Sequence, residues 1–110
     1  MVLGDFNAHG GLGRNEEEEG WGPFQAAMQN FNGKRLTELM VKCDMVASST
    51  YWQCPPTFFG GDGGRSTVDY VLVPRGVLPC VKRARVLMAK GAAVQLATVG
   101  RRLDHMPVQV

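Results

Sequence analysis

Cysteine is scarce in this chain, and its three cysteines show no sign of pairing. Cys43, Cys54 and Cys80 are odd in number, widely separated and free of any C-x-x-C motif. This spacing argues against a disulfide framework and against a structural zinc site. It favours a reducing, intracellular compartment, either nucleus or cytoplasm, over secretion.

Long apolar runs and a strong net charge are lacking as well. No stretch reaches the about 18 apolar residues of a membrane-spanning helix, and the three residues before Gly4 are too short for a signal peptide. The net charge of +2 is too small to indicate a nucleic-acid partner by itself. We therefore expect no membrane association, and any partner has to be inferred from motifs.

The composition that remains is that of one globular domain. The chain has 110 residues, of which 45% are hydrophobic and 20% charged, so it falls within the size and composition of a single folded unit. Fourteen glycines and six prolines predict many turns and short elements. The early "EEEE" block reads as a solvated loop, whereas the last third of the chain is basic.

Hydrophobic periodicity predicts one helix and several strands. Val2 and Leu3 are expected to end a buried strand, and a glycine-rich loop follows over residues 10–23. A helix is expected to start with Asn32 as N-cap and with Phe31 packed on Leu36. Its apolar stripe recurs at i, i+3, i+4 and i+7, at Leu36, Leu39, Met40 and Cys43.

The second half of the chain reads as short strands. "TFFGGDGGRSTVDYVLVP" predicts a strand, a glycine-rich turn and a second strand that ends at Pro74, while "VKRARVLM" and "PVQV" are also strand-like. Side chains alternate between the faces of a strand, so Asp69 shares a face with Val71 and Val73. This order of elements predicts a layered α/β or α+β fold.

Six polar side chains are candidates for chemistry: Asp5, Asn7, His9, Asp69, Asp104 and His105. Taken singly, each also has a structural reading. Asp and Asn after a strand form turns, a histidine beside two glycines sits in an exposed loop, and an Asp-His pair before a proline caps a turn. Asp69 differs from these, because a carboxylate on an apolar face must be paired or hydrogen-bonded if it is buried.

Taken together, the ordered motifs "GDFNAH", "STVDYVLV" and "LDHMPV" resemble the C-terminal half of the endonuclease/exonuclease/phosphatase family. This family includes DNase I-like nucleases, abasic-site endonucleases and inositol phosphatases. The segment from "NFNGKRL" to "STYW" is most similar to the endonuclease domains of LINE-type retrotransposons and their craniofacial-development-protein-like derivatives. The resemblance covers essentially the whole chain.

The resemblance implies hydrolysis of a phosphodiester with Mg²⁺ or Mn²⁺ as cofactor and DNA as partner. By this resemblance, Asp5 orients or deprotonates the attacking water and Asn7 holds the phosphate. Asp104 helps to bind the metal, and His105 contacts the scissile phosphate. Asp69 accepts a hydrogen bond from the other ring nitrogen of His105, which fixes the tautomer and favours the imidazolium.

Three further residues are implied at the substrate edge of the site. Thr57 matches a family segment that supports this edge, whereas Phe58 and Phe59 read more simply as core packing. Arg101 and Arg102 precede the Asp-His pair, and they either contact backbone phosphates or form a solvated pair.

The fold implied is the C-terminal half of a DNase I-like four-layer α/β sandwich, in which one mixed or antiparallel sheet carries one clear helix. Residues 1–110 would be a partial domain whose first strand is central, and the glutamate that is a principal metal ligand in the family has no counterpart here. We therefore expect a marginally stable chain with little nuclease activity alone. Two alternatives stay open: a phosphatase of the same family, or a non-catalytic remnant or interaction module.

Overall fold

The computed structural model describes residues 1–11, 19–25, 28–87, 105–106 and 108–110. Within them, strand β1 (Val2–Asp5) precedes helix α2 (Phe31–Cys43), strand β2 (Met45–Ala47) and a 3₁₀ turn (Ser48–Tyr51). The remaining elements are β3 (Phe58–Phe59), β4 (Arg65–Ser66), β5 (Asp69–Pro74), a second 3₁₀ helix (Arg75–Cys80), β6 (Arg85–Val86) and β7 (Val108–Gln109). The prediction of a mixed α+β domain with antiparallel strands and one clear helix is confirmed.

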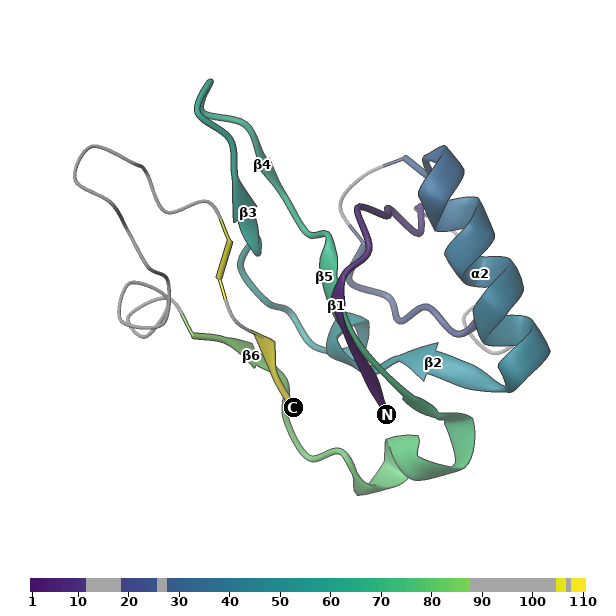
Figure 1. Ribbon diagram of the computed structural model, residues 1–110. Coiled ribbons are helices and arrows are strands. Elements are labelled where there is room, and N and C mark those ends of the chain that lie inside the picture. Colours follow the sequence, from purple (N-terminus) through teal and green to yellow (C-terminus); the bar gives the residue numbers. More distant parts are fainter. Residues whose placement is uncertain (12–18, 26–27, 88–104, 107) are drawn as a thin grey trace.

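The strands belong to three antiparallel sheets, so the expected single sheet is wrong within the described residues. β5 is the centre of the largest sheet, in the order β1-β5-β2, while β3 pairs with β4 and β6 with β7. The strand expected over the whole of "RSTVDYVLVP" is divided, since β4 ends at Ser66 and β5 begins at Asp69. Figure 1 shows α2 on one side of the large sheet and the two small sheets on the other.

The two faces of β5 separate two apolar clusters. One cluster packs beneath α2 and contains Ala8, Trp21, Leu36, Met40, Ala47, Tyr70 and Leu72. The other consists of Val46, Val71 and Val73, covered by half-buried side chains from the turns and from β7. Asp69 is on the second face, together with Val71 and Val73.

Strand β1 lies at the edge of its sheet in the described part of the chain. It pairs with β5 alone, and all four of its residues are exposed, Leu3 by 66%. The expectation of a buried, central strand is therefore wrong for the structure as described, because no second neighbour covers its outer edge.

Helix α2 starts two residues earlier than expected. The N-cap is Asn30, whose side-chain oxygen accepts a hydrogen bond from the backbone N–H of Gly33 at 2.7 Å. Phe31 is 74% exposed, so the expected packing on Leu36 is wrong. The buried stripe consists of Gly33, Leu36, Thr37 and Met40, whereas Leu39 and Cys43 face solvent.

Trp21 fills the space between α2 and the sheet. It is fully buried, its ring meets Tyr70 edge-on at a centroid distance of 5.2 Å, and its indole N–H donates to the hydroxyl of Thr37 at 2.8 Å. Both partners of that hydrogen bond are buried, so the bond satisfies the one polar group of the indole.

No helix in the described ranges is long and apolar enough to cross a membrane.

Candidate functional site

Strands β1 and β5 place two carboxylates side by side. The register pairs Asp5 with Asp69, and directly opposed residues of an antiparallel pair project to the same face. The Asp69 side chain is 18% exposed and that of Asp5 is 47% exposed. The two like charges therefore share one end of the sheet, where a cation or a hydrogen-bond donor would stabilise both.

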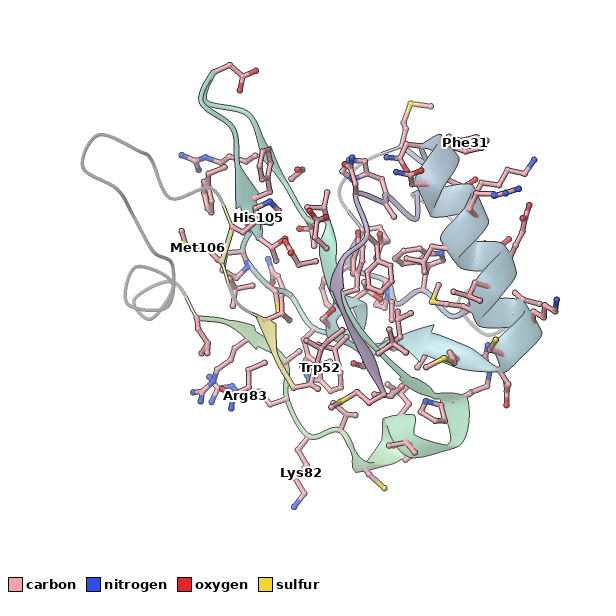
Figure 2. All side chains as sticks on the ribbon, viewed as in Figure 1. Phe31, Trp52, Lys82, Arg83, His105 and Met106 are labelled. Atoms are coloured by element: carbon pink, nitrogen blue, oxygen red, sulfur yellow. The ribbon has the colours of Figure 1, made fainter. Side chains whose placement is uncertain are left out.

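His105 reaches this end of the sheet through contacts with the β3 segment. It forms an antiparallel bridge with Phe58, and the backbone N–H of Met106 donates to the carbonyl of Thr57 at 2.7 Å. The ring of Phe58 packs against the imidazole at a centroid distance of 5.0 Å. Figure 2 shows His105 beside β3. Backbone and ring contacts together fix where the imidazole lies.

The imidazole of His105 lies between the two carboxylates. Its Nδ1 is 3.2 and 3.1 Å from the two carboxylate oxygens of Asp69, while its Nε2 is 3.7 Å from Oδ2 of Asp5. A carboxylate that accepts a hydrogen bond from Nδ1–H fixes the tautomer and the orientation of the ring. Nε2 is then left facing Asp5, on a side chain that is 34% exposed.

Thr57 lies beneath this cluster. It is 1% exposed, and its hydroxyl accepts hydrogen bonds from the backbone N–H groups of Val68 and Asp69 at 3.1 and 3.3 Å. The structure thus gives Thr57 the part of holding the start of β5, whereas the sequence placed it at the substrate edge. Phe58, read as core packing, lies against the imidazole instead.

Asp5 and Asn7 form a tight turn at the end of β1. The backbone N–H of Asn7 donates to Oδ1 of Asp5 at 2.8 Å, and Asn7 has a φ of 46°, which asparagine tolerates better than most residues. The turn reading of these two residues is therefore supported. It leaves Oδ2 of Asp5 facing His105, so the two oxygens of one carboxylate have different neighbours.

Two asparagines at the start of α2 hold this turn in place, and the sequence reasoning missed that function. The side-chain amides of Asn30 and Asn32 both donate to the carbonyl of Asn7 at 3.1 Å. Asn30 also accepts from the backbone N–H of His9 at 2.9 Å. The two asparagines of "NFN" were the available signal, but only a helix cap was inferred, and from Asn32 alone.

The donor atoms of Asp5, Asp69 and His105 lie within 4.8 Å of one another. Mg²⁺ prefers oxygen ligands, and it is commonly held by one or two carboxylates together with waters and substrate phosphate. Asp69 is engaged with Nδ1 of His105, which leaves Asp5 as the carboxylate that fits this role best. Asp104, the expected metal ligand, and Arg101 and Arg102, the expected phosphate contacts, lie outside the described residues.

The cluster borders a hollow of about 180 Å³ on the same face of the sheet. The hollow is lined by Leu3, Gly4, Asp69, Tyr70, Val71, Met106 and Val108. It gives the candidate site an open flank between β1 and the segment that carries His105.

No protein-family model, curated protein or solved structure matches the chain.

Tyr70 is a buried residue that follows Asp69 in strand β5. It is 1% exposed, and its hydroxyl lies 2.8 Å from the carbonyl oxygen of Ala8 and 2.7 Å from that of Thr67. Burial raises the pKa of this phenol strongly, and the negative charge of Asp69 adds to the shift. The hydroxyl therefore stays protonated and ties the loop after β1 to the start of β5.

The raised pKa of Tyr70 predicts a loss of stability in alkali. The pKa of this phenol is higher in the folded chain than in the unfolded chain, where it is about 10. Its contribution to stability is therefore complete below pH ~10 and falls as the pH rises above that value. Urea unfolding at a series of pH values should show the fall. Tyr70→Phe lacks the ionisable group, so its stability should decline less above pH ~10. Equal slopes for the two proteins would contradict the assignment.

Proposed function

We propose that this chain contributes the C-terminal part of a Mg²⁺-dependent phosphodiesterase site that cleaves nucleic acid. The observation that carries the proposal is the imidazole of His105, held at Nδ1 by Asp69 and directed through Nε2 toward Asp5. In the same proposal, the helix-backed sheet is part of a DNase I-like sandwich, of which residues 1–110 form a partial domain. The resemblance of "GDFNAH", "VDYVLV" and "LDHMPV" to the family supports both statements.

Each residue of the cluster has a part in this chemistry. Asp5 orients the attacking water and takes up its proton through the oxygen that faces the cluster. His105 donates from Nε2 to an oxygen of the scissile phosphate, and Asp69 stabilises the imidazolium by accepting from Nδ1. The amide of Asn7 holds a second phosphate oxygen. Mg²⁺, for which the resemblance implies Asp104 as a ligand, would neutralise the negative charge that builds up on the phosphate.

The two histidines of the chain allow a direct test. We expect a short DNA duplex added with Mg²⁺ to shift the ring proton signals of His105 in an NMR spectrum. His9 serves as internal control, because its backbone N–H, and not its ring, contacts Asn30. The His105 signal should shift less with Mg²⁺ alone, and Asp69→Asn should weaken the response to DNA.

Other outcomes separate the competing functions. A His105 shift with a phosphomonoester such as an inositol phosphate, and none with DNA, would favour a phosphatase. Equal shifts of both histidines, or none with either ligand, would contradict the proposal and favour a non-catalytic protein.

A further inference from the structure

An open groove lies away from the Asp5–Asp69–His105 cluster. It has a volume of about 570 Å³ and runs past the second 3₁₀ helix, the start of β6 and the two ends of the chain. Its lining residues are Met1, Val73, Val77, Cys80, Val81, Lys82, Arg83, Arg85, Gln109 and Val110. We call it the terminal groove. In Figure 2, Lys82 and Arg83 point outward from the segment that borders it.

The interior of the terminal groove is apolar and accessible. Met1 is 75% exposed, Val77 43% and Val110 39%, and Val73 and Val81 belong to the apolar cluster beneath. A concave set of aliphatic side chains gains free energy when apolar groups displace water from it. An occupant with only polar surface would not gain this free energy, so the groove favours an occupant with apolar side chains.

The rim of the terminal groove is basic. Lys82, Arg83 and Arg85 line it, no acidic residue does, and all three are exposed. The guanidinium of Arg85 donates to the side chain of Gln109 at 2.9 Å, while Lys82 and Arg83 have no ion pair with any described residue. The rim thus presents positive charge that nothing in the described chain neutralises.

We propose that the terminal groove binds an acidic, amphipathic segment of a partner protein, which places apolar side chains in the groove and carboxylates against Lys82 and Arg83. Charge complementarity and the aliphatic interior together favour this occupant. No aromatic side chain lines the groove, so it offers no stacking platform for nucleobases. Its concave shape is unsuited to a flat lipid surface. The binding surface is separate from the proposed phosphodiesterase site and does not depend on that function.

A synthetic peptide tests this proposal. The probe is a short fluorescein-labelled peptide that alternates valine and glutamate, and its counterpart carries lysine in place of glutamate. Fluorescence anisotropy should detect binding of the acidic peptide alone. The double variant Lys82→Glu/Arg83→Glu should weaken that binding by about tenfold or more. The control Lys34→Glu/Lys42→Glu makes the same change in net charge on the exposed face of α2 and should bind like the unaltered chain.

Cysteine labelling gives a second readout on the unaltered chain. Cys80 lines the terminal groove and Cys43 lies on α2, and both are free and exposed. The acidic peptide should slow alkylation of Cys80, measured by mass spectrometry, and leave Cys43 unchanged. Equal binding of the two peptides, or equal losses in the two double variants, would overturn the proposal. So would displacement of the acidic peptide by a DNA oligonucleotide or by anionic vesicles, which would assign the groove to those ligands.

Discussion

Replacing Trp21 by alanine is expected to remove most of the stability of the chain. Truncation of a fully buried tryptophan costs about 3–5 kcal/mol, and a domain of this size has a total stability of about 5–15 kcal/mol. The low end of that range fits this chain, since β1 is exposed and buries little apolar surface. The variant also removes one of the three hydrogen bonds of the buried Thr37 hydroxyl, which keeps its bonds to Gly33 and Gln29.

The exposed Phe31 provides the matched control. It is 74% exposed at the start of α2. Phe31→Ala therefore removes an aromatic ring without opening a cavity in the core. Circular dichroism and urea unfolding should show a loss of about 3–5 kcal/mol for the tryptophan variant and less than about 0.5 kcal/mol for the control. Similar stabilities of the two variants would mean that the core is not built around Trp21.

Replacing His105 by alanine is expected to bring metal-dependent cleavage of DNA to the background rate. We expect that cleavage to be slow in the unaltered chain, because the resemblance implies a further glutamate ligand that the sequence does not supply. A positioned general acid contributes about 10²–10⁴-fold to such a step. Plasmid nicking in Mg²⁺ or Mn²⁺, followed over long incubation, should show the difference.

A substrate with a better leaving group distinguishes the part that His105 plays. If its Nε2–H protonates the leaving oxygen, His105→Ala should lose less activity on a nitrophenyl phosphodiester, whose leaving group needs no proton, than on DNA. His9→Ala is the control and should retain activity on both substrates. Rapid plasmid cleavage by the unaltered chain would contradict the expected need for another carboxylate, and cleavage that survives in His105→Ala would exclude the proposed role.

The face assignment of β5 was the part of the fold that the sequence predicted best. Alternation in "TVDYVLV" placed Asp69 with Val71 and Val73, and strand geometry alone determines that result. The position of Asp5 opposite Asp69, in contrast, depends on the register between two strands that are far apart in the sequence. No local pattern specifies that register, and the resemblance to a family placed both residues in one site without predicting that they pair.

The errors arose where tertiary contacts override local patterns. Asn32 was predicted as the N-cap, but the cap is Asn30, which also accepts a hydrogen bond from the backbone N–H of His9. No helix pattern shows that contact. Thr37 was not part of the predicted apolar stripe, yet it is buried and its hydroxyl accepts a hydrogen bond from the Trp21 indole. The helix is therefore rotated relative to the predicted stripe, with Leu39 turned toward solvent.

The sequence could not predict which residues hold the strands of the site in place. Thr57 was placed near substrate because its neighbours in the chain resemble a family segment, whereas its hydroxyl accepts from the backbone of β5. A single hydroxyl can contact a ligand or cap a backbone with the same sequence signature. Only burial, here 1% exposure, separates the two.

Gly33 lies in the buried face of α2, directly against the loop that carries the Asn7 turn. A Cβ atom at this position would overlap the carbonyl oxygen of His9 and come 3.1 Å from the side-chain oxygen of Asn30. Any larger residue would push the helix away from that loop and displace Asp5 with it. During divergence, position 33 should therefore stay glycine in every descendant that keeps the cluster, even where surrounding residues drift, and its loss would mark lineages in which selection on the site has ended.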